Sequence, residues 1–191
     1  MHNEKSELRT RLLTRRRALT AGERAAAARA LAGHAGALAE PGATVAAYVS
    51  VGSEPGTGPL LDALRERGVR VLLPVLLPDN DLDWAEYGGP RELAPAGRGL
   101  LEPVGPRLGP EAVTAASVVL LPGLAVDRRG LRLGRGGGSY DRVLARLERA
   151  RARPVLAVLL YEDELLARVP AEPHDRSVDL AVVPSGPQRL G

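Results

Sequence analysis

The chain has 191 residues, of which 45% are hydrophobic, so it can bury a sizeable core, and we expect one α/β domain over residues 1–191. The sequence contains no cysteine, which excludes disulfides, thiolate metal sites and a cysteine nucleophile. The formal net charge of +3 comes from basic residues spread along the chain, and aromatic residues make up only 3%, so we expect no nucleic-acid partner.

The N-terminus is charged and lacks the apolar core of a secretory signal, and no stretch approaches the roughly 18 apolar residues of a membrane span. We therefore expect a cytoplasmic protein without a membrane partner, monomeric or weakly associating. Lys5 is the only lysine among 26 basic residues. This is consistent either with a coding bias toward arginine or with a need for a compact ammonium at position 5.

The first expected element is a helix over residues 5–19, with leucines along one side and arginines around the rest. Lys5 and Arg9 lie one turn apart on it, so they either belong to a solvated basic face or grip a polyphosphate together. Thr20 and Glu23 form a capping-box pattern, which opens a second, alanine-rich helix that ends before a Pro-Gly pair.

Apolar runs alternate with helical patterns through the rest of the chain, and residues 88–116 indicate no particular chemistry. Strands are expected at residues 44–50, 69–76, 82–87, 117–121, 154–160 and 178–183, and helices at 58–67, 138–150 and 161–167. Near-continuous apolar strands joined by helices indicate a parallel sheet covered on both faces, with 82–87 at an edge. Pro74 should mark a strand end or an irregularity. Glu54 follows a strand where such sheets place ligands, and is either a ligand contact or a solvated loop acid.

The most informative segment is an arginine–glycine loop at residues 132–138, which follows a buried strand and precedes a helix. Glycines at 134, 136, 137 and 138 let the backbone approach a ligand closely, and Arg132 and Arg135 add positive charge. With a helix N-terminus beside them, these features indicate an anion site for phosphate, and Asp141 suits a magnesium ion carried in by a nucleotide. Glycine clusters also form tight turns or mobile tails, and the flanking strand, helix and acid favour the ligand site.

Other site types fit this loop poorly. A Walker A sequence is absent, and the glycine spacing does not match a dinucleotide fingerprint. Ser139 lacks the frame of a nucleophile elbow, and His174 is the only histidine downstream of it. A lone His174–Asp175 pair in a loop is most often an ordinary surface feature. The segment therefore favours nucleotide phosphates over a serine hydrolase.

With these segments identified, the chain resembles the 5-formyltetrahydrofolate cyclo-ligase family over nearly its whole length. The resemblance rests on four blocks in the family's order: KSELR at 5–9, YVSVGSEPGT at 48–57, LLPGLAVDRRGLRLGRGGGSYDR at 120–142 and VPAEPHD at 169–175. Three positions depart from the family pattern. Ser139 and Val126 stand where aromatic residues are usual, and Pro55 replaces the customary residue after Glu54. Because the chain has no Phe, the pterin pocket cannot have the family's usual walls.

The resemblance implies a three-layer, Rossmann-like α/β fold with a mostly parallel central sheet and helices on both faces. It implies ATP- and Mg²⁺-dependent cyclisation of 5-formyltetrahydrofolate to 5,10-methenyltetrahydrofolate, with release of ADP and phosphate. The ATP-binding residues that it implies are Lys5, Arg9, Arg132, Leu133, Gly134, Arg135, Gly136, Gly137, Gly138, Ser139 and Tyr140. The folate-binding residues that it implies are Val49, Glu54, Arg135, Gly136, Gly137, Gly138 and Ser139. The Mg²⁺ ligands that it implies are Asp141 and Asp175, and the catalytic cations are Lys5, Arg132 and Arg135.

Two alternatives stay open: a non-catalytic nucleotide- or RNA-binding relative on the same scaffold, and a family member acting on a different small amide. Glu54 and the acid pair discriminate between a binder and an enzyme, since a pure binder has little need for Asp141 and Asp175 together. The spatial prediction is that the N-terminal cations, the arginine–glycine loop and the two aspartates converge around one triphosphate. Glu54 should face that triphosphate across a cleft.

Overall fold

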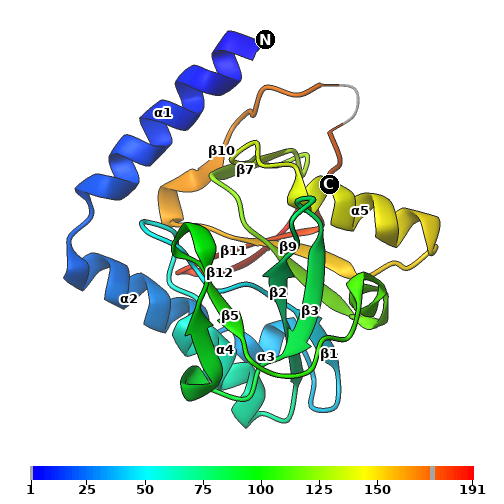
Figure 1. Ribbon diagram of the computed structural model, residues 1–191. Coiled ribbons are helices and arrows are strands. Elements are labelled where there is room, and N and C mark those ends of the chain that lie inside the picture. Colours follow the sequence, from blue (N-terminus) through cyan, green and yellow to red (C-terminus); the bar gives the residue numbers. More distant parts are fainter. Residues whose placement is uncertain (1, 173–174) are drawn as a thin grey trace.

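The computed structural model describes residues 2–172 and 175–191, and within them the main sheet has seven strands in the order β12-β11-β9-β6-β1-β2-β3 (Figure 1). The strand bounds are β1 Thr44–Ala46, β2 Arg70–Leu76, β3 Leu82–Glu86, β6 Val118–Leu121, β9 Val155–Leu159, β11 Leu180–Val183 and β12 Gly186–Arg189. The inner strands are parallel, whereas β3 and β12 pair antiparallel at the two edges. The chain order of the parallel strands reverses between β1 and β6, and open α/β sheets bind ligands at such a switch point.

Helices cover both faces of this sheet. On one face lie α2 (Ala21–Ala32), α3 (Ala35–Leu38) and α4 (Gly58–Glu66), which pack Leu31, Leu60 and Leu64 into a buried cluster with Val45 and Leu120. On the other face, α5 (Ser139–Arg149) and the 3₁₀ segment η3 (Pro110–Ala115) join a second buried cluster with the opposite side chains of the strands. The three-layer, mostly parallel arrangement expected from the sequence is therefore confirmed.

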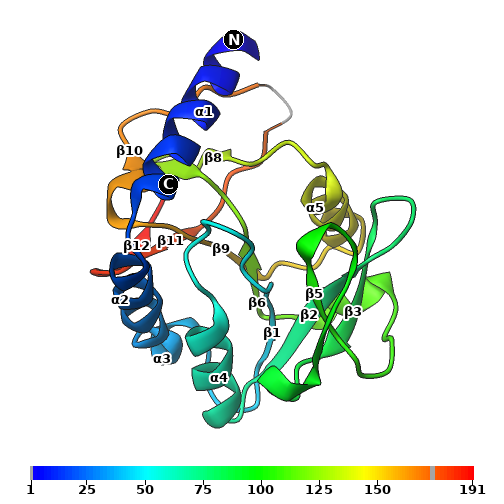
Figure 2. The same ribbon diagram turned by 60° about the vertical axis from the view of Figure 1, so that its left-hand side comes forward.

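The N-terminal helix packs against a separate small sheet instead of the main one. Helix α1 (His2–Ala18) buries Leu8 and Leu12 against Leu124 and Leu133. The small sheet has the order β10-β7-β8, with β7 at Ala125–Asp127, β8 at Arg132–Leu133 and β10 at Leu165–Leu166. Figure 2 shows α1 standing at the end of the molecule where this sheet lies. The capping box predicted at Thr20 and Glu23 is present at the start of α2.

Several expected boundaries are wrong. The helix expected at 161–167 is a short 3₁₀ segment, η4 (Glu162–Glu164), followed by β10, because Glu164 pairs with Arg16 of α1 and the residues after it pair with β7. Pro74 lies inside β2 and does not end it. The backbone N–H and C=O groups of successive β2 residues point alternately toward β3 and β1. The Val71 carbonyl accepts from the Tyr87 amide on the β3 side, and the Leu72 carbonyl accepts from the Ala47 amide on the β1 side. The nitrogen of Pro74 therefore faces the side on which β1 has already ended, so no ladder hydrogen bond is lost.

Strands β4 (Leu93–Pro95), β5 (Leu101–Pro103), β7, β8 and β12 had no counterpart among the expected elements. Strand β12 turns back from β11 at the sheet edge, and the segment after β3 forms a hairpin of β4 and β5. The 3₁₀ turns η1 (Pro90–Glu92) and η2 (Gly97–Gly99) flank β4. This hairpin packs beside the carboxyl-terminal half of β2, so a segment that indicated no chemistry helps to shape the molecule's main cleft.

Candidate functional site

A cleft of about 560 Å³ opens at the carboxyl ends of β1, β2 and β6, which is the switch point of the sheet. Its lining comes from α1, from the loops after β1 and β6, from the start of α5, from the β4–β5 hairpin and from the segment after β10. Every residue that the sequence assigned to ATP, folate or magnesium lines this cleft: Lys5, Arg9, Val49, Glu54, Arg132, Leu133, Gly134, Arg135, Gly136, Gly137, Gly138, Ser139, Tyr140, Asp141 and Asp175.

The arginine–glycine loop is supported from below by Asp127, which is fully buried. Its carboxylate accepts from the amides of Arg129, Leu131 and Val169 and from the Arg129 guanidinium, at 2.7–3.2 Å. Burial alone would raise the pKa of Asp127, but these hydrogen bonds lower it below its ordinary value. The charged carboxylate fixes the turn from β7 to β8 and so fixes the backbone position of Arg132, the first residue of β8.

Arg132 is the cation held deepest in the loop. Its side chain is 12% exposed, its Nη1 donates to the Pro122 carbonyl at 2.8 Å, and its Nη2 lies 4.0 Å from Asp141. Burial lowers the pKa of Arg132, yet a guanidinium stays protonated in proteins, so this is a charge held partly out of water. A Cβ at position 134 would lie 2.9 Å from Arg132 Nη1, so a larger residue there would displace the end of this side chain. An anion bound in the cleft would compensate the Arg132 charge for the water contacts that it loses on burial.

Helix α5 begins at the cleft. Its N-cap is Gly138, with φ 78°, a left-handed conformation that favours glycine, and no side chain caps the first turn. The leading amides of α5 and the positive end of its dipole therefore face the cleft beside Ser139, Tyr140 and Asp141, as an anion site requires. Burial, with Glu54 nearby, raises the pKa of Tyr140, so its phenol stays protonated at neutral pH.

The N-terminal cations reach the same loop from α1. Arg9 Nε donates to the Gly134 carbonyl at 2.9 Å, and a Cβ at Gly136 would lie 4.0 Å from its Nη2. Lys5 is buried, and its ammonium lies 2.7 Å from both Glu172 and Asp175. Burial alone would lower the pKa of Lys5, but its hydrogen bonds to Asp175 and Glu172 raise it, so the ammonium stays charged. His174 lies outside the described residues.

Asp141 and Asp175 are the two carboxylates predicted to hold Mg²⁺. Within residues 2–172 and 175–191, no group of three or more His, Cys, Asp and Glu side chains forms a ready metal cage. Mg²⁺ bound with a nucleotide usually takes only one or two carboxylates, together with phosphate oxygens and water. Asp141 is 79% exposed at the cleft, and Asp175 lines the same cleft. This donor set fits an ion that enters with phosphates and is weak for a metal bound alone.

Glu54 lines the same cleft as the glycine loop. It is 11% exposed, accepts from the Val51 amide at 2.8 Å, and has its carboxylate 3.6 Å from Arg135. Tyr161 donates its phenol to the backbone carbonyl of Glu54 at 3.3 Å, or to that of Ser53 at 3.2 Å. The acid thus sits on a loop that is anchored to a distant part of the chain, which a solvated loop acid would not need.

Tyr161, which supports the Glu54 loop, also contacts a buried ion pair between Arg16 and Glu164. Arg16 makes a two-pronged contact with Glu164 at 2.6 and 2.8 Å and donates to the Gly123 carbonyl at 2.7 Å. Its guanidinium also lies over the Tyr161 ring, 5.6 Å from the centroid. Arg16 therefore joins α1, the segment after β6 and the tyrosine that supports the Glu54 loop. In the sequence it was one of several arginines on a basic face.

Several cleft residues were missed by sequence reasoning. An apolar wall of leucines comes from β2, β3 and the hairpin, and polar residues stand beside it. These lining residues are Tyr48, Val51, Pro74, Leu76, Asn80, Leu82, Arg98, Leu100, Leu101, Glu102, Pro122 and Glu172. Pro74 and Trp84 are paired across β2 and β3, and Trp84 is fully buried in the core. Leucines thus supply the apolar surface that the lack of Phe left unexplained.

The loop between β2 and β3 is held against α5 by charge. Arg146 contacts Asp81 at 2.7 and 3.1 Å and Glu111 at 2.7 Å, while Arg142 lies 3.4 Å from Asp79. The Arg146 guanidinium lowers the pKa of Asp81. A carboxylate with a lowered folded-state pKa stabilises the fold above its unfolded-state pKa, about 3.9, and loses this contribution as pH falls through the folded value.

We therefore expect Asp81→Asn to lower the free energy of unfolding by about 1–3 kcal/mol at pH 7, between the effects of a surface and a buried ion pair, because the Arg146 and Asp81 side chains are only 10% and 13% exposed. The difference from the wild type should shrink as pH falls below about 3.9. Urea unfolding from pH 7 to pH 2 measures it. Asp79→Asn is the matched control, because its pair with Arg142 is longer and both side chains are at least half exposed. A loss that did not change with pH would contradict the assignment.

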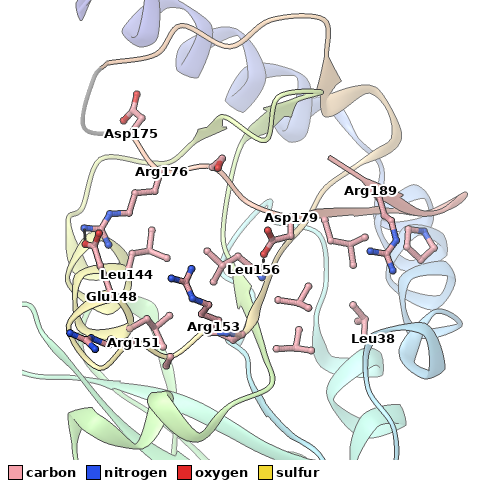
Figure 3. Close-up of a pocket in the computed structure, with 18 of the residues that line it drawn as sticks. Leu38, Leu144, Glu148, Arg151, Arg153, Leu156, Asp175, Arg176, Asp179 and Arg189 are labelled. Carbon is pink, nitrogen blue, oxygen red and sulfur yellow. Dashed lines mark hydrogen bonds and ion pairs between the residues drawn. The ribbon is translucent and has the colours of Figure 1, made fainter. Parts of the chain in front are cut away.

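A larger hollow of about 1140 Å³ lies at the opposite end of the parallel strands, at the amino ends of β6, β9 and β11. Figure 3 shows Arg153 and Arg189 on either side of Asp179 there, while Arg176 pairs with Glu148 at 2.6 Å. Its charged side chains are exposed, apart from the shared Asp175 at its margin, and of the predicted site residues only Asp175 reaches it. The cleft, and not this larger hollow, is therefore the candidate site.

No helix in the described part of the chain is both long and apolar enough to cross a membrane. The model of the 5-formyltetrahydrofolate cyclo-ligase family matches residues 1–184. A 5-formyltetrahydrofolate cyclo-ligase from Mycolicibacterium smegmatis is 46% identical over 185 residues, covering 94% of this chain and 93% of its own length. One from Escherichia coli K12 is 33% identical over 144 residues, covering 74% of this chain and 78% of its own length.

Solved structures agree with these sequence matches. The NMR structure of Aquifex aeolicus 5,10-methenyltetrahydrofolate synthetase superposes with a TM-score of 0.76 at 29% identity, covering 97% of this chain and 92% of that one. A 5,10-methenyltetrahydrofolate synthetase from Mycoplasma pneumoniae gives a TM-score of 0.71 at 20% identity over 93% of this chain and 97% of that one, which supports the fold alone.

Proposed function

The chain belongs to the 5-formyltetrahydrofolate cyclo-ligase family, and from this premise we propose that its cleft closes 5-formyltetrahydrofolate to 5,10-methenyltetrahydrofolate with ATP and Mg²⁺, releasing ADP and phosphate. It is an enzyme of the cyclo-ligase class, as the sequence resemblance implied. One observation carries the finer proposal: cations from α1 and from the loop after β6 line one cleft with Glu54 and two aspartates. A monomeric state and a cytoplasmic location stay predictions.

The phosphate end of the proposed site is the region around the arginine–glycine loop. Lys5, Arg9 and Arg132 supply positive charge, and the leading amides of α5 supply donors that no side chain occupies. Phosphoryl transfer depends mainly on positioning and on neutralising charge that spreads over the transferred group. When it is bound, Mg²⁺ supplies further neutralisation of the phosphates, and Asp141 and Asp175 are the residues that would hold it.

The chemistry needs no protein nucleophile. The γ-phosphoryl group moves from ATP to the formyl oxygen, which turns a poor leaving group into a phosphate. N10 of the folate then attacks the formyl carbon, the C–O bond breaks, and phosphate leaves as N10 loses its proton. The protein's part is to hold N10 near that carbon and to exclude water, a contribution for which intramolecular reactions give large rate gains. The absence of cysteine from the sequence is consistent with this route.

The folate end of the site is proposed to lie between Glu54 and the leucine wall. Glu54 can accept hydrogen bonds from the pterin N–H groups, and Val49 lies beside it in the lining. Leu76, Leu82 and Leu100 give the apolar surface for the ring system. Arg135, 3.6 Å from Glu54, joins the two halves of the cleft and would stand between the two substrates.

We expect the purified chain to form the methenyl product, which absorbs near-ultraviolet light strongly, only when ATP, Mg²⁺ and 5-formyltetrahydrofolate are all present. Each omission should abolish the absorbance rise. If ATP binds by calorimetry and no product forms, the chain is a nucleotide binder and the proposal is wrong. ATP hydrolysis with another N-formyl compound, and none with the folate, would instead favour a different small amide.

A further inference from the structure

One cation at the rim of the cleft has no role in the family resemblance. Arg98 lies in η2, at the tip of the β4–β5 hairpin, and lines the cleft beside Asn80, Leu100 and Leu101. Its side chain is exposed. Among the described residues its polar contact is with the Asn80 amide oxygen, 3.3 Å from its Nη1. The positive charge of Arg98 is therefore not neutralised by a neighbouring acid.

The backbone at this rim is unusual. Arg98 has φ 62° and Asn80 has φ 70°, both in the left-handed region. Asparagine adopts this conformation fairly readily, whereas an arginine there is uncommon and carries strain. The two left-handed turns sit at the tips of neighbouring loops and bring the two side chains together at the cleft. Strain of this kind often persists where a side chain has to reach a ligand.

The acids beside Asn80 are paired with other arginines, and the carboxylate of Glu102, which lines the same cleft, accepts from the Leu76 amide at 3.0 Å. Asp79 and Asp81 flank Asn80 and contact Arg142 and Arg146 of α5. These pairs hold the Asn80 loop in place and leave Arg98 as a cation with an anchored neutral partner. An anion at this rim of the cleft would have Arg98 as its cationic partner.

The leucines that line the cleft indicate what kind of anion would bind Arg98. Leu76, Leu82 and Leu100 line the same cleft as Arg98, so a ligand that contacts both has an apolar body and an acidic end. A reduced folate has this shape, with a ring system, a benzoyl group and a glutamate tail that carries two carboxylates. We propose that Arg98 binds a carboxylate of this tail and so selects substrates that carry it. The inference rests on the proposed function, because it takes a folate as the ligand.

An arginine suits the task, because its planar guanidinium contacts both oxygens of a carboxylate. Since Arg98 is exposed, the gain is that of a surface ion pair, and we expect about a fivefold effect on affinity. The effect should weaken with added salt, because surface charges are screened.

The test compares 5-formyltetrahydrofolate with 5-formyltetrahydropteroate, which has the same rings but no glutamate. Arg98→Asn removes the charge and tolerates the left-handed backbone, and Arg98→Lys keeps the charge without the planar fork. We expect Arg98→Asn to raise the KM for the glutamate-bearing substrate about fivefold and to leave the KM for the pteroate unchanged. Arg98→Lys should fall between Arg98→Asn and the wild type.

Arg91→Ala is the matched control, since Arg91 is an exposed arginine at the start of the same hairpin and does not line the cleft. An equal rise in KM for both substrates would mean that Arg98 only shapes the hairpin, and no rise for either would mean that the tail lies elsewhere. Either result overturns the proposal. Calorimetric binding of the two compounds without ATP gives the same comparison independently of turnover. A wild type that binds both and forms no methenyl product would refute the proposed function, while the binding difference still decides about Arg98.

Discussion

Lys5→Ala is expected to lower the rate of methenyl formation about 10²- to 10³-fold, the usual scale for removing one preorganised charge from a transition state. Lys5 is buried at the cleft with its ammonium 2.7 Å from Glu172 and Asp175, so its position is fixed before any nucleotide arrives. The KM for ATP should rise more than the KM for the folate, because Lys5 stands on the phosphate side of the proposed site. Steady-state kinetics with each substrate varied in turn measures both.

A second variant separates charge from shape at this position, and a third, elsewhere on the helix, is the control. Lys5→Arg keeps the charge but replaces a compact ammonium with a planar fork, and we expect it to recover only part of the activity. Arg11→Ala, on an exposed part of the same helix, should leave the kinetics unchanged. Equal losses for ATP and folate with Lys5→Ala would contradict the assignment to the phosphates. Melting curves of all three variants show whether any loss reflects unfolding.

Arg16→Leu should destabilise the fold by about 3–5 kcal/mol, because it leaves Glu164 as a buried carboxylate without its partner. Arg16 and Glu164 have side chains only 1% and 4% exposed, so water cannot replace the lost contact. For a chain of this size, that corresponds to a fall in the melting temperature of roughly 6–20 °C. Calorimetry or circular dichroism measures it.

The neighbouring residue supplies the control. Arg15 pairs with Asp163, but their side chains are 55% and 56% exposed, so Arg15→Ala should change the free energy of unfolding by less than about 1 kcal/mol. Replacing both buried partners, with Arg16→Met and Glu164→Leu together, should restore much of the stability lost in Arg16→Leu alone. If Arg16→Leu were no more harmful than Arg15→Ala, the buried pair would not hold this part of the fold together.

Local sequence patterns predicted those parts of the fold that local physics decides. The capping box at Thr20, the glycine-led start of α5 and the apolar strands of the parallel sheet follow from residues close together in the chain. The segment at 161–167 does not, because Glu164 bonds an arginine 148 positions away and that contact replaces a helix with η4 and β10. Contacts of this kind have no trace in the local pattern.

The candidate site divides in the same way. The arginine–glycine loop was found from its own composition, and Lys5, Glu54 and Asp175 from a family resemblance, and all of them line one cleft. The roles assigned to them stay predictions. The hairpin wall with Arg98 was missed, since residues 88–116 carry no motif and gain their meaning only from packing beside β2. Arg98 joins the cleft through tertiary packing, so no motif or residue spacing in the sequence marks it.

The seating of α1 has a consequence for how this protein can vary. Leu8 and Leu12 set the helix on the small sheet, and through them they fix the direction in which Lys5 points. One residue inserted between Lys5 and Leu8 would turn the ammonium by about 100° around the helix axis, although both leucines could stay in place. Exposed positions of α1 can therefore be substituted, whereas an insertion or deletion between Lys5 and Leu8 would remove the ammonium from the cleft.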